Sequence, residues 1–331
     1  MDIDHYAPAQ KTDFDEIPII SLSGLDTAEG FERIAHVLVE TAHSVGFFYL
    51  SDHGISTDVM DQAFAASRRF FDLPTGVKGQ VTVNTHQRGW MQSGLAKLEG
   101  SATHDAKEVF FWGWEGENMP SDPEKRPPLV HPNQWPEHEA AFLKKGIWPL
   151  YLQVISLGRQ VLSALAYGLG QSKTFFDQAY ENPLGRGQLV YYPPMNASDI
   201  AQNRLGAAAH TDFGVLTILM QDMQGGLQVR NPAGDWVEAP PVQGTLVCNI
   251  GDLLERWTGG RLTSTLHRVI NRNPTSRYSI PVFCDPASET PIDPRDFGVS
   301  YSAEDVISAG HYIMERNTKN FKHYKSKSAT Q

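Results

Sequence analysis

Apolar positions follow a helical period in the first half of the chain and form short, broken runs in the second half. The segment "FERIAHVLVETAHSV" has five apolar residues on one face of a predicted helix: Phe31, Ile34, Val37, Leu38 and Val45. The same spacing over residues 59–71 predicts a second helix, which Pro74 ends. Residues 137–169 predict a third helix, interrupted near Gly146 and Pro149.

Extended segments lie between and after these helices. "IPIISL" (17–22) and "FFYLSDHG" (47–54) predict strands, whereas residues 84–135 are rich in Gly, Pro and Trp and predict mostly loop. From about residue 185, short apolar runs alternate with turn residues, as in "QLVYY", "GVLTILMQ", "GLQVR", "GTLVCNI" and "YSIPVF". This spacing is typical of an antiparallel sandwich or barrel.

A last helix is predicted from near Ser302, because Asp305 forms a weak capping box with it and apolar positions follow. The predicted fold class is therefore a mainly β core with flanking helices. Helices that cover a sheet form one unit with it, so we expect residues 1–331 to make a single domain. Its expected parts are a helix-rich covering region over 1–184, a β core over 185–285, and a C-terminal helix and tail over 286–331.

Composition and charge exclude several classes of partner. The 331 residues are 40% apolar and 20% charged, as in globular proteins, and the formal net charge is −10 without a dense Lys/Arg run. Nucleic acid and anionic membranes are therefore poor partners. Cys248 and Cys284 lie in apolar strand-like runs, which indicates buried reduced thiols. The N-terminus lacks an apolar core and no apolar run could cross a bilayer, so we expect a cytoplasmic protein.

Three residues have the types and spacing of a metal site. In "AAAHTDFG", His210 and Asp212 are two apart and share one face of a predicted strand. Alone, the pair also fits a hydrogen-bonded surface patch. "TSTLHRVIN" adds His267 on another predicted strand, although a single buried histidine also fits a core position. Two histidines and one carboxylate suit non-haem Fe(II) chemistry, whereas structural zinc requires four closed ligands, usually with thiolates.

A second group has the types that bind an anion. In "RYSIPVF", Arg277 and Ser279 share one strand face, and a buried arginine fork suits a carboxylate. A solvated arginine at the start of a strand is the alternative. Tyr192 in "LVYYPP" can donate a phenolic hydrogen bond into the same pocket, or can pack before the Pro-Pro turn.

The ordered set "AHTDFGVLTILMQD", "GGLQV", "NIGDLLERWT", "STLHRVIN" and "RYSIPVF" resembles the Fe(II)/2-oxoglutarate-dependent dioxygenases, in particular their isopenicillin N synthase-like branch. "GFFYLSDHGI", "RGWMQSG" and "DAKEVFFWG" resemble its N-terminal region. The resemblance implies a double-stranded β-helix (jelly roll), with Fe(II) on His210, Asp212 and His267. It places the distal carboxylate of 2-oxoglutarate on Arg277 and Ser279, with Tyr192 assisting. Plant members often carry Asn where this chain has Val190.

The implied reaction oxidises a small molecule with O2 and 2-oxoglutarate, releasing succinate and CO2, by hydroxylation, desaturation or cyclisation. Five residues are candidate substrate contacts: Trp90 and Phe110 in segments that lie over the family's site, Phe283 by strand parity, and Tyr312 and Arg316 on the C-terminal helix. Ordinary core packing is the alternative for Trp90, Phe110 and Phe283. Two other functions stay open: an iron oxidase independent of 2-oxoglutarate or of ethylene-forming type, and a non-catalytic binding module.

Overall fold

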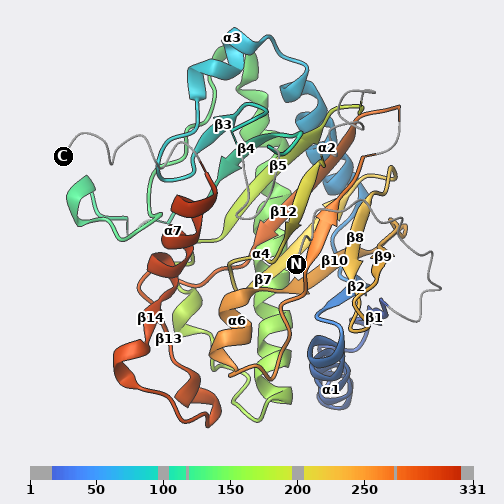
Figure 1. Ribbon diagram of the computed structural model, residues 1–331, viewed down its shortest axis with the longest axis vertical. Coiled ribbons are helices and arrows are strands. Elements are labelled where there is room, and N and C mark those ends of the chain that lie inside the picture. The colour runs from blue at the N-terminus through green and yellow to red at the C-terminus, as the bar shows by residue number, and fades with distance from the viewer. Residues whose placement is uncertain (1–16, 96–103, 117–118, 196–204, 272–273, 322–331) are drawn as a thin grey trace.

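Two sheets form the centre of the protein, and helices cover the outer face of the larger one (Figure 1). The computed structural model describes residues 17–95, 104–116, 119–195, 205–271 and 274–321. The larger sheet has eight strands in the order β1-β2-β10-β7-β12-β5-β4-β3. Their bounds are β1 (Ile19–Ser21), β2 (Phe47–Ser51), β3 (Gly89–Met91), β4 (Glu108–Trp112), β5 (Arg186–Tyr192), β7 (Leu216–Gln221), β10 (Leu246–Ile250) and β12 (Arg277–Phe283).

The smaller sheet has four antiparallel strands in the order β6-β11-β8-β9. Their bounds are β6 (Ala207–His210), β8 (Leu227–Arg230), β9 (Trp236–Glu238) and β11 (His267–Val269). A separate hairpin-like pair consists of β13 (Pro291–Ile292) and β14 (Ile307–Ser308). The prediction of an antiparallel β core flanked by helices is confirmed, and its two sheets stay separate instead of closing into a barrel.

The helices begin where the sequence supplies caps. The hydroxyl of Thr27 accepts a hydrogen bond from the amide of Gly30 at the start of α1, and Ser56 caps α2 in the same way. Helices α1 and α2 both pack against the long α4 (Figure 1). The helix bounds are α1 (Ala28–Ser44), α2 (Thr57–Phe71), α3 (Thr75–Lys78), α4 (Phe142–Gly168), α6 (Asp252–Trp257) and α7 (Ala309–Asn320).

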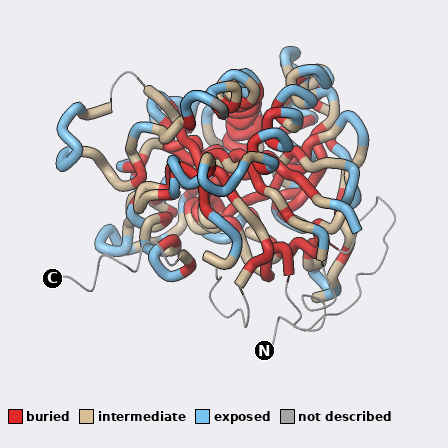
Figure 2. Tube along the Cα trace, turned by 90° about the horizontal axis from the view of Figure 1, so that it is seen from above, coloured by how far each residue is buried: buried red, intermediate tan, exposed pale blue. Residues whose placement is uncertain are grey.

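Buried side chains form two clusters, one on each face of the larger sheet. The buried residues gather in the interior of the molecule, and exposed residues surround them (Figure 2). The outer layer joins the sheet to the helices and includes Leu38, Phe70 and Ile218. The inner layer joins the two sheets and includes Val190 from β5 and Leu227 from β8. Because successive strand residues point to opposite faces, each residue of β4, β5 and β12 belongs to either the helix side or the inter-sheet side.

The structure corrects two expectations in the first half of the chain. Strands β3 and β4 lie within residues 84–135, where a loop was expected, because the short run "EVFFW" gains its partner from β5 far along the sequence. Helix α4 continues through Gly146 and Pro149 without the expected interruption. At Gly146 a Cβ would lie 2.4 Å from the Cβ of Ala66, so the glycine serves close packing of α4 on α2.

The C-terminal helix also starts later than expected, at Ala309. Ser302 caps a single 3-10 turn instead, with its hydroxyl accepting from the amide of Glu304. The chain then pairs in β14 before α7 begins. The predicted start of the last helix near Ser302 is therefore wrong: this residue caps one 3-10 turn, and the chain pairs with β13 before α7 begins.

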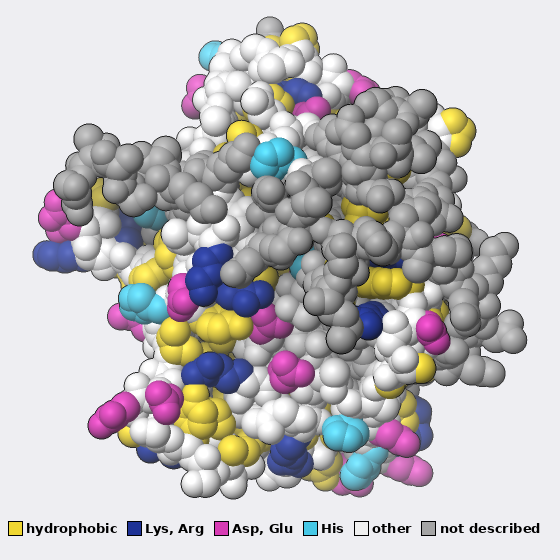
Figure 3. Space-filling model, in the orientation of Figure 1, with side chains coloured by type: hydrophobic (Ala, Val, Ile, Leu, Met, Phe, Trp, Pro, Cys, Tyr) yellow, Lys and Arg dark blue, Asp and Glu magenta, His cyan; other side chains and the backbone are white. Residues whose placement is uncertain are grey.

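Two expectations about the whole chain are tested by the described residues. Cys248 and Cys284 are both buried free thiols, as predicted. Within the described ranges, no helix has the length and apolar character that a bilayer span needs. On the face drawn in Figure 3, the basic and acidic side chains of the described residues are interspersed.

Candidate metal centre

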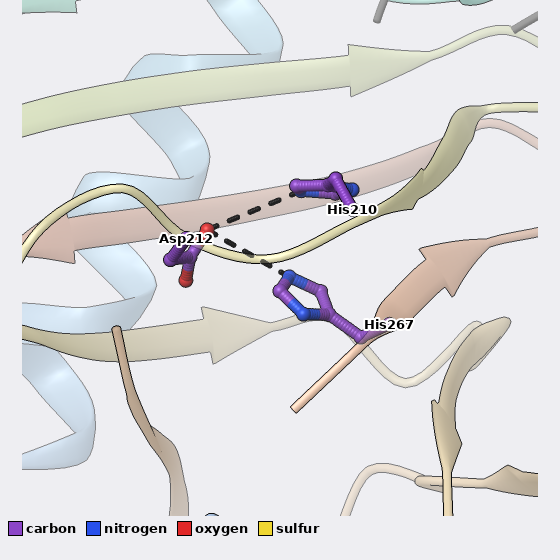
Figure 4. A group of neighbouring side chains, drawn as sticks. All are labelled: His210, Asp212 and His267. Carbon is purple, nitrogen blue, oxygen red and sulfur yellow. Dashed lines mark ion pairs between the residues drawn. The ribbon is translucent and has the colours of Figure 1, made fainter. Parts of the chain in front are cut away.

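His210, Asp212 and His267 converge on one point between the two sheets (Figure 4). His210 ends β6, Asp212 follows in the next loop, and His267 begins β11, where it lies opposite His210 in the strand register. Nε2 of His210 lies 4.0 Å from Oδ1 of Asp212, and Nε2 of His267 lies 3.7 Å from the same oxygen. One ligand atom from each residue therefore lies within 4.8 Å of the other two.

Backbone carbonyls orient both imidazoles. Nδ1 of His210 is 2.7 Å from the carbonyl oxygen of Ala208, and Nδ1 of His267 is 3.1 Å from that of Thr265. A carbonyl only accepts, so each Nδ1 carries the proton and donates it. Each Nε2 then keeps its lone pair for a metal, which is the arrangement that outer hydrogen bonds enforce in metal sites.

The carboxylate of Asp212 is oriented in a similar way. Its Oδ2 accepts hydrogen bonds from Oγ1 of Thr217 at 2.6 Å and from Nδ2 of Asn249 at 2.8 Å. This leaves Oδ1 facing the two histidines. The sequence did not single out Thr217 or Asn249, although both lie in the segments "GVLTILMQ" and "NIGDLLERWT" that carry the family resemblance.

The protonation states fit a divalent cation. Burial, and then the neighbouring His267, hold the pKa of His210 well below its ordinary value, so its imidazole is neutral. Burial alone would raise the pKa of Asp212, but both histidines and the hydrogen bonds from Asn249 and Thr217 lower it instead. The neutral imidazole of His210 and the ionised carboxylate of Asp212 are the forms that bind a metal.

The loop that carries Asp212 is held by the start of α6. The amide of Asp252 donates to the carbonyl of Asp212 at 2.7 Å, and the amide of Leu253 donates to that of Gly214 at 3.0 Å. A Cβ at Gly214 would lie 1.8 Å from Oδ1 of Asp285, so only glycine allows this approach. The glycine of "HTDFG" is therefore part of how the loop presents its carboxylate.

We expect Asn249→Ala to weaken divalent-metal affinity about 10–100-fold without unfolding the protein, because Asp212 loses an orienting donor. Metal titration with Co(II), with circular dichroism as the folding check, measures this. Thr217→Val should act in the same direction. Tyr49→Phe, which removes a partly buried hydrogen bond to the Pro240 carbonyl, should leave affinity unchanged. Equal metal affinity in Asn249→Ala and the unsubstituted protein would contradict the role of Asn249.

A cavity of about 80 Å³ adjoins the centre between the sheets, and the predicted anion-binding residues line it. Arg277 on β12 lies opposite Tyr192 on β5, with its guanidinium 4.9 Å from the centre of the tyrosine ring. Its Nε donates to the carbonyl of Gly225 and its Nη2 to Oε1 of Gln221. Its Nη1 is buried and has no hydrogen-bond partner within the described part of the chain. A buried charged donor without an acceptor fits a carboxylate ligand.

Ser279 and Val190 are opposite each other in the same register, and both line this cavity. The position where plant relatives often carry Asn therefore faces the expected co-substrate with an apolar side chain. The contact that an asparagine would make there is missing, whereas the Arg277–Ser279 pair is retained.

Lys107 is a lining residue that sequence reasoning did not identify. Its Nζ forms an ion pair with Oδ2 of Asp105 at 2.9 Å, and Oδ1 of Asp105 accepts from the amide of Ala208 on β6. Burial alone would lower the pKa of Lys107, but Asp105 raises it above its ordinary value, so the ammonium stays charged. The lysine lies in the family-like segment "DAKEVFFWG", two residues after its partner Asp105, and only the fold brings the cavity to it.

A second cavity, also of about 80 Å³, adjoins the first and shares His210 and Asp212 with it. Phe283 lines both cavities, in line with its strand parity. Trp90 and Phe110 line neither: they are register partners on the helix side of β3 and β4, and Phe110 packs 5.1 Å from Phe70 between ring centres. The adjacent residues on these strands point to the other face of the sheet and line the second cavity, so we take them as candidate contacts in place of Trp90 and Phe110: Met91, Val109 and Phe111.

Tyr312 and Arg316 lie just outside this second cavity. The Tyr312 hydroxyl is 3.4 Å, and Nη2 of Arg316 is 3.7 Å, from Oδ2 of Asp252 at the start of α6. The Arg316 guanidinium also lies 4.6 Å from the ring centre of Phe213, which lines the cavity. These two residues join α7 to α6, whereas Asn317 near the end of α7 and Phe321 just after it reach the cavity.

Comparisons with known proteins agree with this geometry. Residues 17–138 match the family described as non-haem dioxygenase in morphine synthesis N-terminal, and residues 187–286 match the 2OG-Fe(II) oxygenase superfamily. The 2-oxoglutarate-dependent dioxygenase citB of Monascus ruber is 35% identical over 84% of this chain and 86% of its own length.

Solved structures give the same result. A full-length Neurospora crassa protein in complex with alpha-KG and thymine has a TM-score of 0.80 and 29% identity, over 92% of this chain and 98% of that chain. JOX2 in complex with 2OG, Fe and JA has a TM-score of 0.77 and 25% identity, over 98% of this chain and 92% of that chain.

Proposed function

The chain belongs to the 2OG-Fe(II) oxygenase superfamily and is an Fe(II)- and 2-oxoglutarate-dependent oxidoreductase with the jelly-roll fold, and on this basis we propose that it oxidises a small organic molecule beside His210, Asp212 and His267. One observation carries the proposal. Two oriented Nε2 atoms and one oriented Oδ1 face a common point, next to a buried guanidinium Nη1 that lacks an acceptor among the described residues.

In this proposal His210 and His267 bind iron through Nε2 and Asp212 binds it through Oδ1. Three protein ligands leave further positions for exchangeable ligands. Bound iron supplies the oxidising chemistry, in which one molecule each of 2-oxoglutarate and O2 yields succinate, CO2 and an oxidised substrate. The hydrogen bonds to Ala208, Thr265, Thr217 and Asn249 keep the ligand atoms aimed while substrates enter and leave.

Arg277 binds the distal carboxylate of 2-oxoglutarate through its free Nη1 edge, because its Nε and Nη2 are already held by Gly225 and Gln221. Ser279 donates its hydroxyl from the same face of β12, and Tyr192 closes the cavity from β5. The apolar lining that includes Val190, Leu219 and Leu227 excludes water, which strengthens the ion pair.

The second cavity receives the organic substrate, with Phe283 between it and the co-substrate. A small-molecule substrate agrees with the thymine and JA complexes of the similar structures. We further propose one domain over residues 1–331, because strands from 17–112 complete the sheet that carries Arg277. The buried thiols Cys248 and Cys284 support a reducing compartment such as the cytoplasm.

Anaerobic addition of Fe(II) and 2-oxoglutarate to the purified protein tests the proposal. We expect a visible metal-to-ligand charge-transfer band that is absent when 2-oxoglutarate is omitted. Succinate release then provides the readout for screening substrates under air. Iron binding without the band would instead favour a 2-oxoglutarate-independent oxidase, ethylene in the headspace would identify the ethylene-forming type, and failure to bind iron would favour a binding module.

A further inference from the structure

Asn317 has an amide group that the described part of the fold does not use. The residue lies near the end of α7, its side chain is 1% exposed, and it lines the second cavity together with His210. Neither Nδ2 nor Oδ1 has a hydrogen-bond partner within the described part of the chain. Buried polar groups are almost always paired because an unpaired one costs folding free energy. An unpaired donor and acceptor at a cavity wall therefore indicate a ligand.

A neighbouring asparagine shows that the helix itself does not impose this. Asn320 is on the same helix and also buried, and its Nδ2 donates to the carbonyl of Arg316 at 2.7 Å. The difference lies in what each side chain faces. Asn317 faces the cavity, one helical turn before Phe321, which lines the same cavity.

The cations around this cavity already have carboxylate partners. Lys107 pairs with Asp105 at 2.9 Å, and Nε of Arg186 pairs with Oδ2 of Asp285 at 2.8 Å. Nη1 of Arg186 donates to Oε1 of Gln87. Since both positive charges are neutralised by buried carboxylates, the cavity does not require an anionic ligand, and an uncharged polar one fits better.

The rest of the wall is aromatic. Four phenylalanines line the cavity: Phe111, Phe213, Phe283 and Phe321. The rings of Phe111 and Phe321 meet nearly perpendicularly, at 89° with 6.4 Å between centres. Aromatic walls of this kind favour a flat apolar body, which packs face-on or edge-on against phenylalanine rings.

We propose that the substrate of this oxygenase is an uncharged ring compound with an amide-like edge, an N–H beside a C=O, and that Asn317 determines this specificity. An asparagine amide offers one donor and one acceptor side by side, which complements the same pair on a lactam. A carboxylate would occupy only the donor and an ester or lactone would offer only acceptors. The inference rests on the proposed function, because it takes the second cavity as the substrate site.

The first test is thermal unfolding of the metal-free protein without ligands. Asn317→Leu replaces an unpaired amide by an apolar group of similar volume, so its Tm should rise. Asn320→Leu is the matched control, because it removes a paired amide from the same helix, and its Tm should fall. A fall in the Tm of Asn317→Leu would show that the amide is used within the fold and would overturn the proposal.

The second test measures binding by calorimetry without oxygen, on protein carrying Fe(II) and 2-oxoglutarate. The probes are 2-pyridone, N-methyl-2-pyridone, 2-pyranone and benzoate. We expect 2-pyridone to bind at least about tenfold more tightly than the other three, from two neutral hydrogen bonds, and Asn317→Leu to lose this preference while Asn320→Leu keeps it.

The outcomes separate the two proposals. Failure of 2-pyridone to bind, equal binding of the four probes, or an unchanged preference in Asn317→Leu would each overturn the role of Asn317. Absence of the charge-transfer band in the unsubstituted protein would overturn the proposed function instead. The Tm comparison of the two asparagine variants does not depend on that band.

Discussion

Replacing His210 by alanine is expected to abolish turnover, because it removes one of only three proposed protein ligands. Loss of a residue that merely orients a ligand weakens metal affinity about 10–100-fold, so loss of the ligand itself should exceed about 100-fold. The fold should survive, since the side chain is partly exposed at the end of β6 and its Nδ1 bonds a carbonyl only two residues away. Iron titration, oxygen consumption and circular dichroism together measure these effects.

His43→Ala is the matched control for this variant. His43 is an exposed histidine whose Nδ1 also lies at hydrogen-bond distance, 2.9 Å, from a backbone carbonyl, that of Arg261. Its removal should leave iron affinity and turnover unchanged. Normal turnover in His210→Ala would show that the metal assignment is wrong, however well the three ligand atoms converge.

Replacing Arg277 by alanine should raise the apparent KM for 2-oxoglutarate by a factor of about 30 or more. Removing one partner of a buried, hydrogen-bonded charge pair costs about 2–5 kcal/mol, and about 2 kcal/mol corresponds to roughly 30-fold. Iron affinity should change little, because Arg277 contacts none of the three proposed ligands in the hydrogen bonds it makes. Arg277→Lys should recover part of the loss, since lysine restores the charge but not the planar fork.

Arg230→Ala is the control for the loss of an arginine from the β core. Its Nε donates to the carbonyl of Gly234 in the turn after β8, away from the cavity lining. The KM for 2-oxoglutarate should stay unchanged in this variant. The carboxylate-binding role of Arg277 fails if the requirement for 2-oxoglutarate is equal in the Arg277→Ala and unsubstituted proteins, measured by succinate release.

Local patterns predicted those parts of the fold whose partners are close in sequence. Helices α1 and α2 have apolar faces and caps within a few residues, so periodicity found both of them. Strands β3 and β4 were missed because their short runs become strands only by pairing, β3 with β4 and β4 with the distant β5. Strand parity predicted that Phe283 faces the pocket, and the residue lines both cavities. Parity could not be applied to Trp90 and Phe110 until β3 and β4 were known to be strands.

The sequence by itself determined the class of chemistry. His210 and Asp212 share one short segment, His267 with Arg277 and Ser279 follow in order, and the ordered set is more specific than any one piece. Tertiary structure decided how the ligand atoms are oriented and which side chains surround them. Asn249 and Lys107 reach the centre from distant strands and loops, and the unpaired amide of Asn317 has meaning only beside its cavity. The residue types determine which kind of ligand a site can bind. The orientation and burial of these side chains, and which polar groups lack a hydrogen-bond partner, depend on contacts between segments far apart in the chain.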